Sequence, residues 1–156
     1  MMSKTSKLLY LTVTVIFFVI FNACVSDMIL NNSNALIQNP ILDIVFVSNQ
    51  GAAFNIFDGY KIFLITFSLI AILGIIVYVT KHIQKIPAIG LFFISLLICV
   101  IFNNMAERII FGFVRDYIKL NFIDFPVFNI SDIFINIGVL GIIILLLKES
   151  YITKKN

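Results

Sequence analysis

Residues 125–132 read Phe-Pro-Val-Phe-Asn-Ile-Ser-Asp and lead into a segment without charge, Ile133 to Leu147. A carboxylate at the opening of a membrane helix is costly, so Asp132 needs a physical reason to be there. One reason is local. Asn129 is placed to cap the helix, and Asp132 faces the free N–H groups and the positive end of the helix dipole. The stretch therefore predicts a helix from residue 130, and taken alone it favours a structural role for Asp132.

The composition places the chain in a membrane. Of its 156 residues, 61% are hydrophobic and 12% are charged, and the mean hydropathy is +1.09. These values lie outside the range of soluble domains. The formal charge of +3 is small and scattered, without the basic and aromatic alternation of a nucleic-acid-binding face, so we expect no nucleic-acid partner. No repeat, linker or low-complexity tract divides the chain, which predicts one domain over residues 1–156.

Four apolar segments are long enough to cross the hydrocarbon core, which takes about 20 residues at about 1.5 Å rise per residue. They predict helices at about 8–25, 62–80, 86–106 and 130–147, followed by a short basic tail. Pro87 suits the first turn of the third helix. We therefore expect an all-α membrane protein with four transmembrane helices.

The first apolar segment has a second interpretation. Its basic start and its end at Asn22-Ala23-Cys24 are also typical of a cleavable lipoprotein signal with Cys24 as the acceptor. Phe21 and Asn22 fit such a cleavage site poorly and three further spans follow, so we favour a membrane anchor. Cys24 and Cys99 lack the spacing of a metal site or of a disulfide framework, which predicts two buried thiols.

Two segments outside the helices have the composition of strands. Residues 41–47 and 113–120 collect β-branched and aromatic residues over strand lengths. We expect them to pair as a small extracytoplasmic β-element at the membrane surface. The first segment is followed by Asn49 and by small residues at 51–53, where missing side-chain bulk lets another backbone approach. A simple turn before the second helix explains the same residues equally well.

The basic residues predict the orientation in the membrane. Seven of the eleven Lys and Arg residues lie in the amino-terminal segment, the 81–85 turn and the carboxyl-terminal tail, and four lie in the 26–61 and 103–129 loops. By the positive-inside rule the first side is cytoplasmic. Both termini are then cytoplasmic, and the polar residues of the two large loops gather at the outer face.

Two carboxylates at that face, Asp116 and Asp132, lie on either side of a loop that can fold back and bring them together. Two close carboxylates cannot both ionise cheaply, so such a pair holds one shared proton. The ionised member takes a proton from water while the protonated member donates to a carbonyl oxygen, which is peptide hydrolysis without a metal or cofactor. The amides of Asn49, Asn104 and Asn129 are candidate donors to substrate or oxyanion, with loop or cap hydrogen bonding as an equal alternative.

The segments that carry these residues resemble the motifs of the lipoprotein signal peptidases, or signal peptidase II, a family of membrane aspartic peptidases. They are Asn49–Phe54, Asn104–Asp116 and Phe125–Asp132, within a resemblance over about residues 8–147. The resemblance implies catalytic aspartates at Asp116 and Asp132. It also implies a bacterial cell membrane location and cleavage of prolipoproteins before their diacylglyceryl-cysteine, with membrane lipid as the surrounding partner. The candidate substrate-binding or supporting residues are Asn49, Gly51, Ala52, Asn104, Arg108 and Asn129.

The sequence also departs from the family pattern. Where the pattern has an Asp and a Lys near the end of the first helix, this chain has Asn22 and Ser26. Losing both charges is milder than losing one, because no unpaired charge then stays buried. The other departures are Glu107 for Asp, Asn103 and Val100 for glycines, and Ser131 for alanine. Both aspartates are retained, which favours an enzyme over a non-catalytic lipoprotein-binding or scaffold protein derived from the same family.

Overall fold

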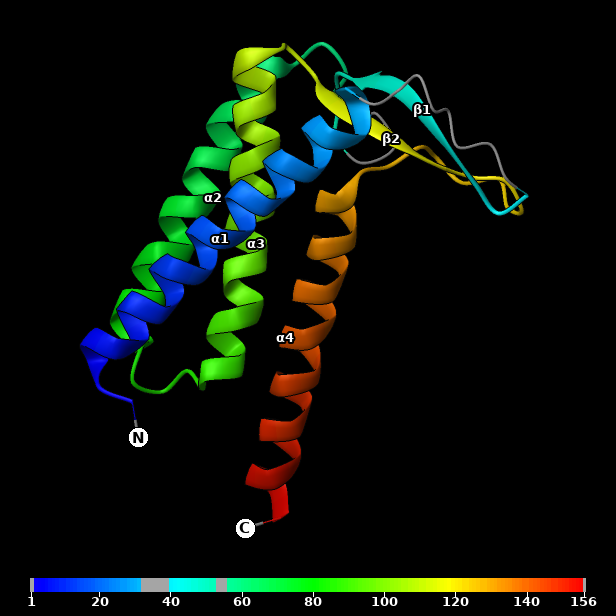
Figure 1. Cartoon of the computed structure of the whole chain (residues 1–156). Coiled ribbons are helices and arrows are strands. Elements are labelled where there is room, and N and C mark those ends of the chain that lie inside the picture. Colours follow the sequence, from blue (N-terminus) through cyan, green and yellow to red (C-terminus); the bar gives the residue numbers. More distant parts are fainter. Residues whose placement is uncertain (1, 32–39, 53–55, 156) are drawn as a thin grey trace.

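Six elements follow one another in the computed structural model of the chain (Figure 1). They are α1 (Lys4–Asn31), β1 (Leu42–Asn49), α2 (Lys61–His82), α3 (Ala88–Ile110), β2 (Val114–Leu120) and α4 (Ile130–Lys155). The structure describes residues 2–31, 40–52 and 56–155, with side chains as far as Tyr151. Within these ranges four helices are long and apolar enough to cross a membrane. The predicted class, four transmembrane helices with a small β-element, is confirmed.

α3 is the central helix of the bundle. It packs against α1, α2 and α4, and 44% of its most apolar stretch is buried, against 11–17% for the other three helices. α4 approaches it closely at Gly138, where an added Cβ would lie 2.8 Å from Leu97 Cδ2 and 3.1 Å from the Phe93 carbonyl oxygen. Small residues permit such close packing of membrane helices. The outer three helices turn most of their apolar side chains toward the surroundings.

Three helices extend beyond their predicted ends. The predictions that these helices end at about residues 25, 106 and 147 are therefore wrong. α1 continues to Asn31, α3 to Ile110 and α4 to Lys155. High hydropathy marks only the part of a helix that lies within the membrane. It therefore does not predict the polar turns with which these helices continue. In α1 those turns are held by β2, because Ser26 bonds the Tyr117 hydroxyl and Asp27 pairs with Arg115. The residues expected to form a basic tail make the last turns of α4.

The two cysteines differ in their surroundings. Cys99 on α3 is buried, as predicted, whereas Cys24 on α1 is exposed, so the prediction of a second buried thiol is wrong. α1 turns Asn22 and Ser26 inward, which directs Cys24 away from the bundle. A helix that is apolar on all sides gives no sequence signal for which face is buried.

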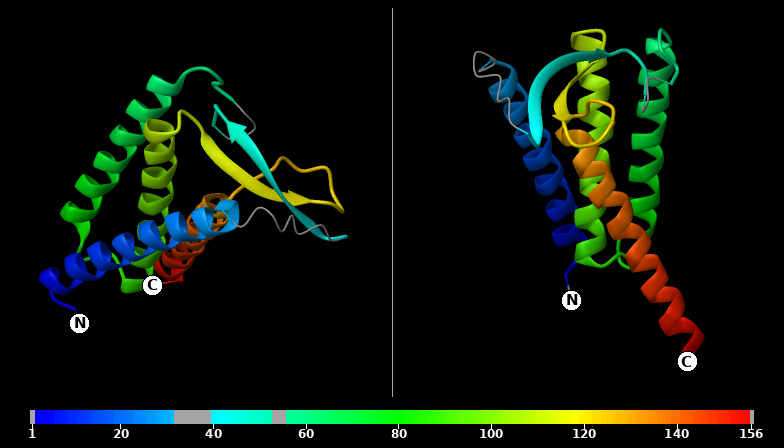
Figure 2. Two further views of the ribbon diagram at one scale, coloured as in Figure 1. Left: turned by 45° about the horizontal axis from the view of Figure 1, so that its top comes forward. Right: turned by 90° about the vertical axis from the view of Figure 1, so that its right-hand side faces the viewer.

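β1 and β2 pair antiparallel, as predicted, at the end of the bundle where α1 and α3 finish and α4 begins (Figure 2). β1 has one extra residue between Ile44 and Val47, a bulge that bends a strand and increases its twist. Beyond the bulge Val47 lies opposite Asp116 and Asn49 lies opposite Val114. Residues two apart on a strand share a face, so Asn49 and Asp116 are diagonal neighbours on one face of the sheet.

Candidate active site

Asp116 lies in a cradle of two amide groups. Its side chain is 4% exposed and accepts hydrogen bonds from Asn49 Nδ2 at 3.0 Å and from Asn129 Nδ2 at 2.6 Å. The oxygen atom of each amide group accepts a second hydrogen bond, which fixes the orientation of the group. Asn49 Oδ1 accepts from the Gly51 N–H, and Asn129 Oδ1 accepts from the Ser131 N–H. A flipped amide would lose that bond and turn an oxygen toward the carboxylate. Both donors to Asp116 are therefore fixed in orientation.

Asp132 lies in the first turn of α4, where it forms a capping box. Its Oδ2 accepts from the Asn129 backbone N–H at 2.9 Å, while Asn129 Oδ1 accepts from the Ser131 N–H at 2.7 Å. The local capping role predicted for these residues is therefore present. It does not exclude a second role, because Asn129 Nδ2 donates at the same time to Asp116. One asparagine thus connects the two aspartates.

A return of the chain to the sheet sets this arrangement. After β2 the backbone turns back, and Phe128 exchanges two hydrogen bonds with Ile118, at 3.0 Å and 2.7 Å. The Tyr117 N–H also donates to the Phe128 carbonyl oxygen at 3.0 Å. This pairing fixes Asn129, the next residue, beside Asp116 and determines where α4 begins.

The environment of Asp116 favours its protonated form. The pKa of Asp116 is raised from 3.8 to about 6, and burial is the largest of the causes. The hydrogen bond from Asn49 opposes this rise in pKa, the negative charge of Asp132 adds to it, and the hydrogen bond from Asn129 opposes it. Asp116 therefore exchanges its proton much closer to neutral pH than an ordinary aspartate.

Both aspartates line a cavity of about 380 Å³ between the sheet and the ends of the helices. Seven of the eight predicted site residues border it: Asn49, Ala52, Asn104, Arg108, Asp116, Asn129 and Asp132. The apolar wall comes mainly from α2 and α3, with Leu64, Phe67, Ala71, Val100 and Ile101, and Ile135 of α4 completes it. The cavity thus combines a carboxylate-bearing side with a hydrocarbon side.

Arg108 joins α3 to the segment after β1. Its Nη1 donates to the Asn104 carbonyl oxygen at 3.1 Å, and its Nη2 donates to the Gly51 carbonyl oxygen. The Gly51 carbonyl oxygen is thus in contact with a guanidinium group. Ala53, the last of the three small residues, lies outside the described residues. Among those that are described, nothing bonds the buried Nε of Arg108, and a buried donor without a partner is costly.

A charged network that the sequence analysis did not assign holds the start of β2. Glu107 accepts from Arg115 Nε at 2.9 Å, from Nη2 at 2.8 Å and from the Arg115 backbone N–H at 2.8 Å. Arg115 Nη1 also pairs with Asp27 of α1 at 2.8 Å. Arg115 Nε and Nη2 both donate to Glu107 Oε1 and the backbone N–H donates to Oε2, and such charge-assisted hydrogen bonds are stronger than neutral ones. The network links α1, α3 and β2 one residue before Asp116. In the sequence, the opposite charges of Glu107 and Arg115 are the feature that could have predicted this network.

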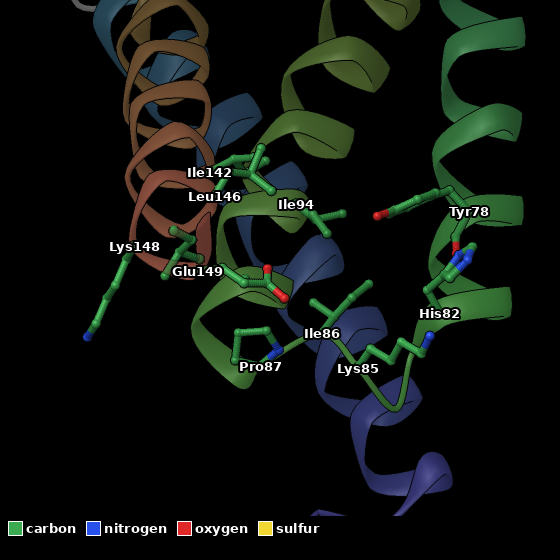
Figure 3. Close-up of a pocket in the computed structure, with 12 residues that line it drawn as sticks. Tyr78, His82, Lys85, Ile86, Pro87, Ile94, Ile142, Leu146, Lys148 and Glu149 are labelled. Atoms are coloured by element: carbon green, nitrogen blue, oxygen red, sulfur yellow. The ribbon is translucent and has the colours of Figure 1, made fainter. Parts of the chain in front are cut away.

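A second cavity, of about 560 Å³, lies at the opposite end of the bundle between α2, α3 and α4 (Figure 3). Tyr78, His82 and Lys85 border it on one side, and Ile142 and Leu146 on the other. None of the predicted site residues borders it, and Glu149 is the one carboxylate among its lining residues. The paired carboxylates therefore belong to the smaller cavity.

The chain is similar in sequence and in fold to known proteins. The family model Signal peptidase (SPase) II matches residues 11–148. The lipoprotein signal peptidase of Streptococcus thermophilus (strain CNRZ 1066) is 33% identical over 112 residues, 70% of this chain and 71% of that protein. The lipoprotein signal peptidase of Caldicellulosiruptor bescii is 38% identical over 109 residues, 70% of this chain and 69% of that protein. A solved bacterial membrane enzyme superposes with a TM-score of 0.76 at 31% identity, covering 90% of this chain and 88% of that one.

The four spans and the fold are those of an integral membrane enzyme. The chain belongs to the signal peptidase II family, as the match over residues 11–148 establishes. It is a multi-pass peptidase of the bacterial inner membrane, in a family that processes the signal peptides of prolipoproteins.

The cap formed by Asn129 generates a stability prediction. Asn129→Ala removes the oxygen that accepts from the Ser131 N–H, whereas Asn129→Ser keeps a capping oxygen but does not reach Asp116. Thermal unfolding in detergent should find the Ser variant more stable than the Ala variant by about 1 kcal/mol. Asn136→Ala, at an exposed position of α4, is the matched control and should change stability by less than about 0.5 kcal/mol. Equal stability of the Ser and Ala variants would rule out the cap.

Proposed function

We propose that this protein is an aspartic endopeptidase that cleaves prolipoproteins before the diacylglyceryl-cysteine, with Asp116 and Asp132 as its catalytic pair. The observation that carries the proposal is that two carboxyl groups border one cavity and are connected by Asn129, and the charge of Asp132 raises the pKa of Asp116. A carboxyl pair with one shared proton supplies both the base and the acid that peptide hydrolysis needs. No metal or cofactor takes part in this chemistry.

The reaction follows from the state with one shared proton. The ionised carboxylate takes a proton from a water molecule, whose oxygen bonds to the scissile carbonyl carbon while the protonated carboxyl donates to the carbonyl oxygen. The tetrahedral intermediate then collapses and the C–N bond breaks. A proton passes to the leaving nitrogen, which becomes the new amino terminus on the lipid-bearing cysteine. The signal peptide leaves with the new carboxyl group.

The neighbouring polar residues divide into two roles. Asn49 and Asn129 use their Nδ2 groups on Asp116 and their oxygens on backbone N–H groups, so they position the aspartate and do not bind substrate. Arg108 Nε is buried without a partner among the described residues, and Asn104 borders the same cavity. We assign these two side chains to the peptide carbonyl groups of the substrate.

The hydrocarbon wall supports a lipid-bearing substrate. Leu64, Phe67 and Ala71 of α2 line the same cavity as the aspartates, and burying apolar surface contributes about 25 cal/mol per Å². The acyl chains of the modified cysteine lie along this wall, while the peptide reaches the carboxyl pair. Peptides without the lipid lose this contribution and bind weakly.

The orientation is also a proposal: both termini are cytoplasmic and the site is at the outer face. The split of basic residues supports it. The start of α1 and the end of α4 lie at the same end of the bundle, away from the sheet (Figure 1). At that end Lys7 donates to the carbonyl oxygens of Ile83, Gln84 and Ile86, which ties α1 to the turn between α2 and α3.

The catalytic pair predicts the effect of two substitutions. Asp132→Asn keeps an oxygen that accepts from the Asn129 N–H, so the cap and the fold persist while the shared proton is lost. Asp116→Asn keeps one oxygen for one of the two fixed donors, Asn49 or Asn129, and places its amide N–H groups against the other, so its folding needs a separate check. Release of signal peptide from a diacylated prolipoprotein in detergent should fall by about 10²–10⁴-fold in each variant, and the double variant should be no worse.

Asp124→Asn, at an exposed position of the same outer loop, is the matched control and should cleave normally. Near-normal cleavage by folded Asp132→Asn would refute the catalytic pair. If the unmutated protein bound diacylated prolipoprotein and never cut it, the non-catalytic alternative would hold instead.

The orientation is tested by labelling in intact cells, with Cys24 and Cys99 replaced. A cysteine at Asn121, beside the outer end of β2, should react with a membrane-impermeant maleimide supplied from outside. A cysteine at Gln84, in the exposed turn between α2 and α3, should react only after the membrane is opened. The reverse pattern would place the carboxyl pair in the cytoplasm and contradict the proposal.

A further inference from the structure

Four polar side chains are buried together where α1, β2 and α4 meet. Asn22 and Ser26 lie one turn apart on α1, Tyr117 lies on β2, and Ser131 lies in the first turn of α4. Each is at most 3% exposed. Buried polar groups in a low-dielectric environment are costly unless all of them are hydrogen-bonded. When they are fully hydrogen-bonded, they hold the structure in a single geometry.

Their hydrogen bonds form one continuous chain. The Ile130 backbone N–H donates to the Tyr117 hydroxyl at 3.4 Å, and this hydroxyl lies 3.1 Å from Ser26 Oγ. Ser26 Oγ in turn donates to Asn22 Oδ1 at 3.5 Å, and Asn22 Nδ2 donates to Ser131 Oγ at 2.7 Å. Ser26 has one hydroxyl proton, directed at Asn22, so Tyr117 must be the donor to Ser26. None of the four side chains adds a charge.

Two members of this chain stand next to the aspartates in the sequence. Tyr117 follows Asp116 on β2, and Ser131 precedes Asp132 on α4. The Ser131 N–H also donates to Asn129 Oδ1, and Asn129 Nδ2 donates to Asp116. A displacement of Ser131 therefore also displaces the carboxyl groups of Asp116 and Asp132.

We propose that Asn22, Ser26, Tyr117 and Ser131 form an uncharged clamp that positions Asp132 against Asp116. The proposal rests on the function proposed above. The clamp ties the first turn of α4 to α1 and to β2 from the side away from the cavity. Because it is neutral, it fixes the geometry without adding a charge that would move the shared proton of the pair. Its members are positioning residues and touch no reacting atom.

The clamp is tested by deleting single hydroxyl groups. Ser131→Ala removes the acceptor of Asn22, and Tyr117→Phe removes the link to Ser26 while keeping the buried ring. Ser95→Ala is the matched control, because Ser95 is fully buried on α3 and, within the described residues, bonds only locally, to the Phe92 carbonyl oxygen. With a diacylated prolipoprotein substrate, both clamp variants should lose about 10-fold in kcat with KM changed less than about twofold.

The pH dependence of kcat/KM distinguishes a loss of positioning of the aspartates from a loss of overall stability. When Asp132 moves away, its charge raises the pKa of Asp116 less, so the alkaline limb of kcat/KM should move to lower pH in the clamp variants. Ser95→Ala should leave kcat and this limb unchanged. Asn22→Ala combined with Ser131→Ala should cost no more than the worse single change, because Asn22→Ala already breaks the bond to Ser131. If Ser131→Ala and Ser95→Ala altered kcat, KM and the pH profile alike, the clamp would be refuted.

Amide hydrogen exchange supplies a readout that does not depend on cleavage. Peptides covering the start of α4 should exchange faster in Ser131→Ala and in Tyr117→Phe than in Ser95→Ala or the unmutated protein. Unchanged exchange there would also overturn the clamp. If the unmutated protein does not cleave, the proposed function fails, and exchange alone decides whether the clamp holds α4.

Discussion

The hydrogen bond from Asn129 to Asp116 is the contact on which the site depends, because Asn129 belongs to two structures at once. Its oxygen and backbone close the first turn of α4 around Asp132, and its Nδ2 holds Asp116 on β2. The start of a membrane helix and the edge of a sheet are thereby fixed to each other through one side chain. The cap that local sequence chemistry favours and the proposed catalytic pair are therefore parts of a single arrangement.

The arginines are bonded to groups other than Asp116, which bears on the proton that the proposed carboxyl pair would share. Arg115 is bonded to Glu107 and Asp27, and Arg108 donates to backbone carbonyl oxygens. In the described part of the chain no cation is bonded directly to Asp116, which is held by amides instead. A bonded guanidinium would lower the pKa of a carboxyl group, whereas amide donors only moderate the effect of burial. Positive charge thus shapes the site without neutralising it.

The sequence predicted the features that depend on long or local signals. Four apolar segments of about twenty residues identified the spans, and strand-like composition identified β1 and β2. The sequence did not predict contacts between distant positions. Asn22 and Ser131 are 109 residues apart, and Asp27 and Arg115 are 88 residues apart. Taken one by one, Asn22 and Ser131 were departures from a family pattern. In the structure they are two partners of one hydrogen bond, because a hydroxyl at 131 satisfies an amide at 22.

The most direct test of the account is an infrared titration of the buried carboxyl groups, from about pH 4 to about pH 8. The account predicts a protonated-carboxyl band in the unmutated protein that titrates at a pH of about 6 and is absent in Asp116→Asn. In Asp132→Asn the midpoint should move to lower pH, because the neighbouring negative charge has been removed. A midpoint unchanged in Asp132→Asn would contradict the account, since it would show that the two aspartates titrate independently and share no proton.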